Sequence, residues 1–456
     1  MSIFQPTRLT CDTVSLDIAG LRQGWYADAY FRNIVTILQT LAEQGYGFAG
    51  HSQRLAGQGY DPQGADIGNM VVEMQWFTRR KPYSVVAGVD IALLMLEHGT
   101  GYYAPDGRFI STYAHYDVEA VQDGVLVRYE GNPQQVQPVL KVRGRYRDVA
   151  ALETTTVGVL SRATRVATNV YHVMRAARGK PVLFFPARFD DYTVQALDGY
   201  AYFIGVQRYN HDYQQHVGCF VSTDAQGSWW GGRGGGTLAH AAISAFLDDT
   251  AELMLAFAAI LPVETPRIAL VDYDNDCVGT TLAVMDAMFA RYRTSIDAGQ
   301  TDEAQRYQLT GVRPDTSNAL RDVSVPPLGA KQLDMGVNPR LIFALREAID
   351  SAWQRWELGA DWRERARQWC QNVRIVATGG FNAERISQFE SMGVPVDIYG
   401  VGSSLFSNSD SDGTNNDYTA DTVRVQLAGQ WYAMAKVGRA ACHNPDLEVV
   451  SRATQT

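Results

Sequence analysis

The sequence predicts an α/β protein in which a mixed N-terminal part precedes a parallel sheet, either open or closed as a barrel. Three observations lead to this prediction. Helical and strand patterns are mixed up to about residue 148, and antiparallel pairing is expected there. After that point short apolar strands alternate with helical stretches. Polar side chains gather directly after those strands, where parallel α/β sheets bind their ligands.

Length and composition exclude several classes of protein. The chain has 456 residues, 46% of them apolar, which is enough for two or more domains or for one barrel with an appendage. No apolar stretch approaches the ~20 residues that span a bilayer, and the first residues do not resemble a signal peptide. The net charge of −9 argues against non-specific binding of nucleic acid. We therefore expect a cytoplasmic protein without membrane or nucleic-acid partners.

The cysteines indicate neither disulfides nor a zinc site. They are five in number, scattered along the chain, and never form a Cys-x-x-Cys pair. A disulfide framework needs an even number, and a structural zinc site needs close spacing. The sequence therefore predicts neither a disulfide framework nor a structural zinc site.

The N-terminal third is predicted to mix helices and strands. Residues 18–46 carry apolar side chains at roughly helical spacing. The next expected elements are a strand at 71–77, a helix that begins at 89–96 and a strand at 139–142. Asp123-Gly124 separates two apolar runs, 118–121 and 125–129, and this dipeptide is a strong signal for a β-hairpin turn.

The remaining chain is predicted to supply a parallel sheet. Its six expected strands are 182–185, 217–221, 268–272, 309–313, 373–377 and 396–399. Two of the intervening helices have recognisable ends. Asn338-Pro339 supplies a cap and a first-turn proline. Asn382 precedes a helix that should stop at Gly393.

The stretch 229–241 is the most distinctive of the chain. It contains five glycines between Gly231 and Gly236, and an apolar run that predicts a helix follows from 238 to 257. Thr237 is a plausible N-cap, which would place His240 in the first helical turn, where anions are favoured. The alternative is a flexible glycine loop with an incidental histidine.

Chemically useful side chains follow six of the predicted strands. In chain order these residues are Arg188, then Thr223 and Asp224, Asp272, Arg313 with Asp315, Thr378 with Gly379 and Gly380, and finally Gly402 with Ser403. Arginine beside aspartate can hold an anion next to an acceptor for hydroxyls or hydrated Mg²⁺, and glycines can present backbone amides to phosphate. Each residue alone could instead cap a helix or form a turn. Together they predict one site for a phosphorylated, hydroxyl-rich substrate.

The polar loop 402–417 is either functional or mobile. Its aspartates lack the ligand spacing of an EF-hand, so calcium is not predicted.

The order of these motifs resembles the nicotinate phosphoribosyltransferase family, which shares its fold with nicotinamide and quinolinate phosphoribosyltransferases. The matching stretches are Asp28-Ala29-Tyr30, Leu152-Glu153-Thr154, Phe185-Pro186-Ala187-Arg188, Gly236-Thr237-Leu238-Ala239-His240, Asp272, Arg313-Pro314-Asp315, Thr378-Gly379-Gly380 and Gly400-Val401-Gly402. The resemblance implies an irregular α/β barrel, 149–420, with a mixed α+β N-terminal domain, 1–148, on which 421–456 could pack back.

The resemblance implies transfer of phosphoribose from phosphoribosyl pyrophosphate to the ring nitrogen of nicotinate, coupled to ATP hydrolysis. His240 matches the histidine that is phosphorylated. The matching substrate residues are Tyr30 and Phe185 for the pyridine ring, the former from a neighbouring subunit, Arg188 and Arg313 for the anionic groups, and Thr223, Asp224 and Thr237 nearby. Asp272 and Asp315 match the acids for the ribose hydroxyls and Mg²⁺. Gly379, Gly380, Gly402 and Ser403 match the turns that hold the 5′-phosphate, and a homodimer or higher homo-oligomer is expected.

The sequence departs from the family pattern at three places, one of which is Asp315-Thr316-Ser317-Asn318 where the family often has aspartate-serine-glycine-asparagine. Pro186 replaces the usual glycine after Phe185. Thr223-Asp224 replaces a pair without charge and resembles the nicotinamide-using relatives. A buried aspartate that faced nicotinate would repel its carboxylate, so we expect Asp224 to point toward Thr223 or a loop amide instead. The alternatives are therefore a nicotinamide enzyme or a catalytically silent relative that binds a pyridine nucleotide.

Overall fold

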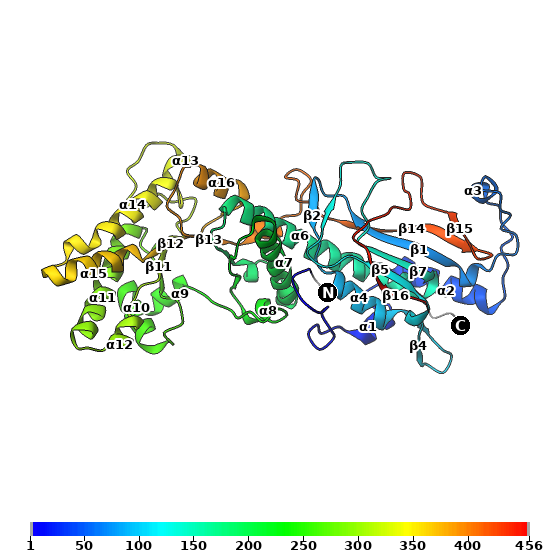
Figure 1. Ribbon diagram of the computed structural model, residues 1–456, viewed down its shortest axis with the longest axis horizontal. Helices are drawn as coiled ribbons and strands as arrows, with labels where there is room; N and C mark the ends of the chain where they lie inside the picture. The colour runs from blue at the N-terminus through cyan, green and yellow to red at the C-terminus, as the bar shows by residue number, and fades with distance from the viewer. Residues whose placement is uncertain (1–2, 454–456) are drawn as a thin grey trace. The chain divides into compact units, whose positions relative to one another are not determined.

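The computed structural model describes residues 3–453, and the chain forms two compact units (Figure 1). The sheet unit consists of Met1–Tyr171, Tyr200–Asp212 and Ser407–Thr456. The barrel unit consists of His172–Gly199 and Tyr213–Phe406. The division therefore falls after residue 171 rather than at 148. One reason is that helix α6 (Glu153–Ala177) is tied to the sheet near its start, where the Trp76 indole donates to the Thr156 hydroxyl at 3.0 Å.

The sheet unit is built on a six-stranded sheet with the order β15-β14-β1-β7-β5-β16. Its strands are β1 (Val71–Thr78), β5 (Asp117–Ala120), β7 (Leu140–Arg145), β14 (Tyr418–Leu427), β15 (Gln430–Ala433) and β16 (Glu448–Ser451). All the pairings are antiparallel. The central strand β1 pairs with β7 on one side and with β14, some 350 residues later in the chain, on the other (Val71 opposite Gln426). The C-terminal residues thus complete a sheet begun by the N-terminal ones.

The predicted hairpin at Asp123-Gly124 is wrong. The strand before it, β5, belongs to the large sheet, whereas β6 (Leu126–Arg128) pairs with β2 (Tyr83–Val85). Asp123 is fully buried and accepts hydrogen bonds from the Val89 amide at 2.9 Å and the Tyr200 hydroxyl at 3.1 Å. Burial, reinforced by the nearby charge of Asp90, raises the pKa of Asp123 to about 7. The carboxylate thus joins the start of α4 (Val89–Gly99) to the core.

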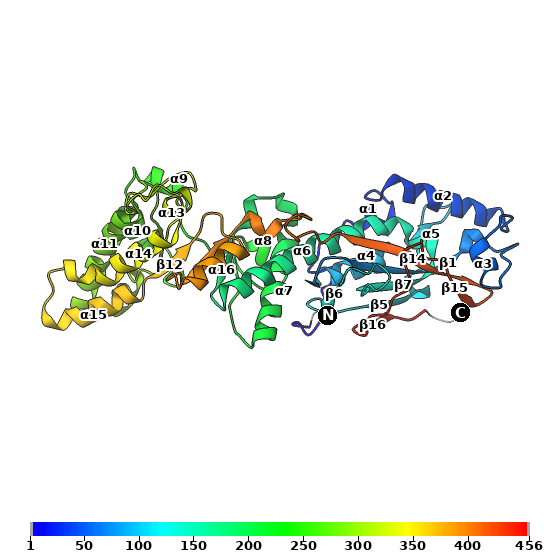
Figure 2. The same cartoon turned by 90° about the horizontal axis from the view of Figure 1, so that it is seen from above.

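The helix predicted over 18–46 is two helices. Helix α1 (Ile18–Arg22) ends early, and α2 (Ala29–Glu43) begins after a turn that contains Gly24 at φ +65°. In Figure 2, α2 lies along one side of the sheet. The remaining elements of this unit are α3 (Gln53–Ala56), α5 (Tyr146–Val149), β3 (Gly101–Tyr103) and β4 (Phe109–Ser111).

The barrel unit contains the predicted parallel sheet, with the order β10-β11-β12-β13-β8-β9. Its strands are β8 (Val182–Phe184), β9 (Phe220–Val221), β10 (Ile268–Leu270), β11 (Gly311–Arg313), β12 (Arg374–Ala377) and β13 (Ile398–Val401). The sheet curls into a half-barrel, so the predicted fold class, an irregular α/β barrel with a mixed α+β part, is confirmed. Helices cover it, among them α11 (Cys277–Asp297), α14 (Pro339–Ser351) and α15 (Ala360–Gln371) (Figure 1).

The glycine-rich stretch extends this sheet beyond β9. Gly234 forms a parallel bridge with Val221, and the Gly235 amide donates to the Val221 carbonyl at 2.8 Å. A Cβ on Gly234 would lie 2.7 Å from the backbone of Thr223, so the close approach requires glycine at this position. These glycines therefore pack a backbone segment against the strand.

The helix predicted over 238–257 is also two helices. Helix α9 (His240–Ala245) ends at a turn in which Leu247 and Asp248 have positive φ, and α10 (Thr250–Ile260) begins anew with Asp249 as its N-cap. The N-cap of α9 is Ala239, so the prediction of Thr237 in that role is wrong. His240 nevertheless occupies the first helical position.

The two helix starts at Asn338 and Asn382 are confirmed. Asn338 accepts from the Leu341 amide ahead of α14, and Asn382 accepts from the Arg385 amide ahead of α16 (Ala383–Ser391). Helix α16 is followed by Gly393 at φ +65°. The other helices here are α7 (Gln195–Tyr213), α8 (Asp224–Gly227), α12 (Thr301–Arg306) and α13 (Lys331–Asp334). Among the described residues, no helix is both long and apolar enough to cross a membrane.

Candidate functional site

The predicted site residues of the barrel unit lie at one edge of its parallel sheet. They follow the carboxyl ends of the strands: Phe185 and Arg188 after β8, Thr223 and Asp224 after β9, Asp272 after β10, Arg313 and Asp315 at β11, Gly379 and Gly380 after β12, and Gly402 and Ser403 after β13. Because neighbouring strands place their ends side by side, residues far apart in sequence meet here. Tyr30 belongs to the sheet unit.

His240 is paired with Asp272. The Nε2 atom of His240 lies 3.1 and 3.2 Å from the two carboxylate oxygens of Asp272. The imidazole is 48% exposed, whereas the carboxylate is only 8% exposed. Burial raises the pKa of Asp272 and the contact with His240 opposes this rise. The carboxylate fixes one ring nitrogen and leaves the other edge of the imidazole toward solvent.

Two residues that sequence reasoning missed support this pair. The ring of Tyr273 lies roughly parallel to that of His240, with centroids 6.5 Å apart. The Ser244 hydroxyl lies 2.9 Å from the Tyr273 hydroxyl and also contacts the carbonyl of His240. The sequence signals for them are local, because Tyr273 directly follows Asp272 and Ser244 lies one helical turn after His240 in α9.

Arg313 lies at the centre of a second cluster. Its Nη1 contacts an Asp315 carboxylate oxygen at 3.2 Å and the Thr378 hydroxyl at 3.3 Å, and its Nη2 donates to the Leu238 carbonyl at 2.8 Å. Thr378 in turn donates to Asp315 at 2.6 Å. Burial lowers the pKa of Arg313, and Asp315 opposes that shift.

These contacts correct the expectation of an arginine fork open to a substrate. Both terminal nitrogens of Arg313 already donate to protein groups. Through Leu238 the guanidinium ties the segment before α9, and hence His240, to the end of β11. In the sequence Thr378 stands out only as the start of a glycine motif, whereas in the structure its hydroxyl completes the cluster.

The Gly379-Gly380 turn follows Thr378 and requires glycine. Both residues have positive φ, +93° and +73°, which other residues adopt only with strain. A Cβ on Gly380 would lie 3.1 Å from the Asn318 amide nitrogen and 3.6 Å from Nη1 of Arg385. Donor groups therefore converge on this turn.

Phe185, Gly402 and Ser403 lie at the adjoining strand ends. The Phe185 amide donates to Val401 at 2.9 Å, and a Cβ on Gly400 would lie 3.0 Å from the Phe185 ring. Gly402 is similarly close to the ring of Phe189, while Ser403 is exposed at the start of a short 3-10 helix, 403–406. Gly400 in β13 and Gly402 just after it thus make room for the aromatic rings that follow β8.

Asp224 points at a loop amide, as expected. Its Oδ1 accepts a hydrogen bond from the Gly234 amide at 2.8 Å. Thr223 caps helix α8 by accepting from the Gln226 amide, and its hydroxyl also contacts Gln195 at 2.9 Å. Both side chains therefore have structural partners.

Arg188 remains exposed near this edge. Its guanidinium lies 5.7 Å from the ring centroid of Phe189, and its charge lowers the pKa of Arg313, which places the two cations near each other. Because Arg313 is engaged, Arg188 is the more accessible of the two arginines for an anionic ligand.

The carboxylates fit Mg²⁺ that arrives with a phosphorylated ligand. Within residues 3–453 no group of three or more His, Cys, Asp or Glu side chains is arranged to hold a metal ion alone. Asp315 faces Arg313 and Thr378, and its charge acts on Asp272, so the two acids share one region. Mg²⁺ commonly uses one or two carboxylates together with substrate phosphates and water.

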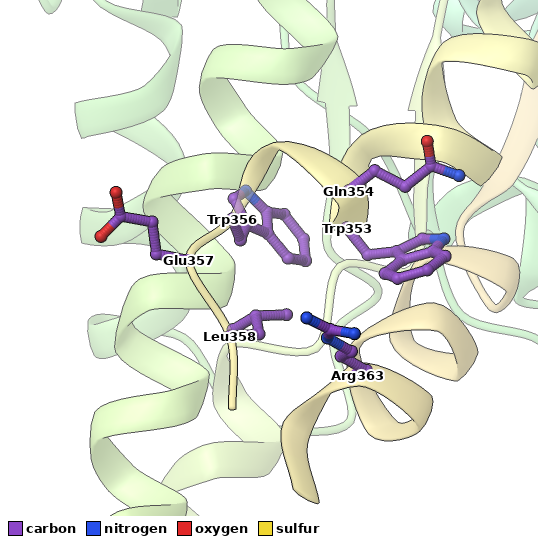
Figure 3. Close-up of a pocket in the computed structure, with 6 residues that line it drawn as sticks. All are labelled: Trp353, Gln354, Trp356, Glu357, Leu358 and Arg363. Carbon is purple, nitrogen blue, oxygen red and sulfur yellow. The ribbon is translucent and has the colours of Figure 1, made fainter. Parts of the chain in front are cut away.

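One cavity adjoins the site and another lies away from it. The first has a volume of about 190 Å³ and is mostly apolar, and Phe185, Gly236 and Thr237 help to line it. The second, of about 520 Å³, is lined by Trp353, Gln354, Trp356, Glu357, Leu358 and Arg363 (Figure 3). Trp356 is held there by stacking on Phe289, with centroids 3.9 Å apart. None of the predicted site residues lines the second cavity.

Comparison with known proteins identifies the fold. No protein-family model matches the chain, and no curated protein does. Among solved structures, the chain is similar to nicotinate-nucleotide pyrophosphorylase from Pyrococcus furiosus, with a TM-score of 0.60 and 21% identity over 98% of this chain and 88% of that one. It is also similar to human nicotinic acid phosphoribosyltransferase, with a TM-score of 0.51 and 15% identity over 88% of this chain and 75% of that one. The fold implied by the motif resemblance is thus confirmed.

Proposed function

We propose that this protein is a phosphoribosyltransferase of pyridine-nucleotide synthesis that transfers phosphoribose from phosphoribosyl pyrophosphate to nicotinate. The observation that carries this proposal is the joint placement of the His240–Asp272 pair and the Arg313–Asp315–Thr378 cluster at one strand edge. The similarity of the fold to a nicotinic acid phosphoribosyltransferase supports it.

For this reaction the protein has to position the two substrates and to stabilise the charges that develop in the transition state. The ring nitrogen of nicotinate attacks the anomeric carbon, the carbon–oxygen bond to pyrophosphate breaks, and no proton has to leave the base. Phe185 would support the ring, and Arg188 would meet the carboxylate or the phosphates. Asp315, oriented by Arg313 and Thr378, would accept from the ribose hydroxyls. Holding the reacting atoms in the correct orientation, with charges placed to stabilise the transition state, supplies much of the rate enhancement of such an enzyme.

Mg²⁺ would be held at Asp272 and Asp315 with the pyrophosphate. It would neutralise the charge that develops on the leaving group.

His240 is proposed as the group that couples ATP to transfer. With Nε2 directed at Asp272, the tautomer that carries its proton on Nε2 is favoured, and Nδ1 then has a free lone pair. Nδ1 would attack the γ-phosphorus of ATP, a nitrogen–phosphorus bond would form, and ADP would leave. Asp272 would balance the positive charge left on the ring.

The assembly is proposed to be a homo-oligomer of two-fold dimers. In this arrangement Tyr30, which is 62% exposed in the sheet unit, would cap the base bound to a neighbouring subunit. The Tyr30 hydroxyl donates to Asp28 at 3.1 Å, and Asp28 also accepts a hydrogen bond from Thr154. These contacts hold the Tyr30 side chain in position.

Nicotinamide is the second candidate substrate. An aspartate facing the ring would favour an amide, but Asp224 is engaged with the Gly234 amide, which supports nicotinate instead. A silent pyridine-nucleotide-binding relative is the remaining alternative, and it would have no need of the His240–Asp272 pair.

The deciding experiment is a substrate panel. Purified protein is incubated with phosphoribosyl pyrophosphate, Mg²⁺ and each pyridine, with and without ATP, and mononucleotide and ADP are quantified. We expect nicotinate mononucleotide, with ADP release stimulated by nicotinate. His240→Ala should lose that ADP release and keep a slow transfer. Absence of any mononucleotide would refute the proposed function, and unchanged ADP release by the variant would refute the role of His240.

A further inference from the structure

Arg385 is a partly buried cation beside the Gly379-Gly380 turn. Its Nη1 donates to the Gly379 carbonyl at 2.6 Å and its Nη2 to the Val337 carbonyl at 2.7 Å. The guanidinium lies 4.4 Å from the ring centroid of Phe381. Carbonyls from two loops and one aromatic ring therefore fix its position at the ends of β11 and β12.

This cation has no carboxylate partner. Within the described residues no acidic side chain lies within ion-pair distance of Arg385, and burial alone lowers its pKa. Arg313 and Arg340 of the same unit are paired with Asp315 and Asp334. A buried charge without a counter-ion is costly, and a bound anion would remove that cost.

The guanidinium also keeps unused donors. An arginine carries five N–H groups, and two hydrogen bonds are formed by the Arg385 side chain. Arg267 is the informative contrast, because it too has no ion pair but donates through all three nitrogens to the carbonyls of Ala258, Leu261, Pro262, Val263, Thr265 and Arg306. The three side-chain nitrogens of Arg267 therefore all donate hydrogen bonds to the protein, whereas Arg385 keeps donors for a ligand.

One nitrogen with a spare N–H lies at the turn, because Nη1 carries two hydrogens and forms one hydrogen bond there. The position that a Cβ of Gly380 would take is 3.6 Å from Nη1 of Arg385 and 3.1 Å from the Asn318 amide nitrogen. Two donor groups from different loops thus converge where glycine leaves space. A ligand that fits here is rich in acceptor oxygens and negatively charged.

We propose that Arg385 is a binding residue for a phosphate monoester at the Gly379-Gly380 turn, with the amide of Asn318 as a second donor. The inference rests on the proposed function, which brings a ribose 5′-phosphate to this turn, and adds the cation that recognises it. A phosphate monoester has three acceptor oxygens and nearly two negative charges at neutral pH, which matches one guanidinium and one amide.

Ribose 5-phosphate tests this proposal without requiring a base or ATP. Its dissociation constant is measured by calorimetry for the parent, for Arg385→Gln and for Arg306→Gln. Arg306 is the matched control, because it also donates to a backbone carbonyl of this unit, Leu261 at 3.1 Å, but lies in α12. We expect Arg385→Gln to weaken binding at least ~10-fold, as for a lost charge-assisted hydrogen bond, and Arg306→Gln to leave it unchanged.

The pH profile separates recognition from a merely structural role. A monoester loses its second charge near pH 6, so parent affinity should fall from pH 8 to pH 5, and more steeply than in Arg385→Gln. Parent-like affinity in a folded Arg385→Gln, or an equal loss at both pH values, would overturn the proposal. If that variant does not fold, Arg385→Met is used, because it keeps much of the aliphatic stem and removes the charge and the donors, and binding as tight as in the parent would again overturn the proposal.

The two proposals fail separately. A parent that forms mononucleotide while Arg385→Gln binds ribose 5-phosphate normally refutes only the role of Arg385. A parent that forms no mononucleotide refutes the proposed function.

Discussion

Replacement of Arg313 by glutamine should lower the stability of the barrel unit, because the guanidinium binds other parts of this unit. The change removes the ion pair with Asp315, the contact with Thr378 and the hydrogen bond to the Leu238 carbonyl. The side chain of Arg313 is 10% exposed and that of Asp315 is 23% exposed. Water can therefore reach Asp315 only in part once the guanidinium is gone.

The expected loss follows from these exposures. Removing one partner of a fully buried pair costs about 3–5 kcal/mol, most of it from the charge left behind. Partial hydration of Asp315 reduces this, while the abandoned Leu238 carbonyl adds about 1 kcal/mol. We expect the free energy of unfolding to fall by about 2–3 kcal/mol, and by roughly 1 kcal/mol in Asp315→Asn, where the arginine keeps two acceptors.

Urea unfolding followed by tryptophan fluorescence measures both variants and the double variant. The double variant should be more stable than the sum of the single losses predicts, because its second change no longer breaks the pair. A loss below about 0.5 kcal/mol in Arg313→Gln would refute the reasoning. Lost transfer activity with parent-like stability would mean that the guanidinium leaves these partners to bind the substrate.

Three further predictions concern other sites. The folded-state pKa of Asp123, about 7, lies above its unfolded value. The stability that the protonated carboxyl contributes is therefore present at low pH and is lost as pH rises through about 7. In thermal melts between pH 5 and pH 8, Asp123→Asn should gain stability relative to the parent. Asp224→Ser should leave the ratio of catalytic efficiencies for nicotinate and nicotinamide in favour of nicotinate, and a parent that prefers nicotinamide would contradict this. Tyr30→Ala should raise the Michaelis constant for the base several-fold, since a stacked ring contributes roughly 0.5–1.5 kcal/mol, and light scattering that finds an active monomer would refute its role across subunits.

The sequence predicted the strand ends because the signal there is local. The apolar runs that end at Asp272 and at Arg313 each mark the end of a strand within a few residues of sequence. The same holds for the caps Asn338 and Asn382, whose acceptors act on amides three residues later.

What could not be predicted depends on contacts between distant segments. Asp123-Gly124 carries the local signature of a hairpin, yet tertiary pairing sends its two strands to different sheets. Thr237 has the chemistry of a cap, but the helix starts later. Arg385 shows no motif at all, because one of its carbonyl partners, Val337, is 48 residues away in the chain.

The pairing of β1 with β14 has a consequence for synthesis on the ribosome. The barrel unit is nearly continuous in the chain and can close once residue 406 has emerged. The sheet unit must wait, with one edge of β1 lacking its partner, until 418–427 are available. An open edge invites pairing with other chains. We therefore expect ribosome-bound chains stopped before residue 418 to aggregate through β1 and to need a chaperone, while their barrel unit already resists protease.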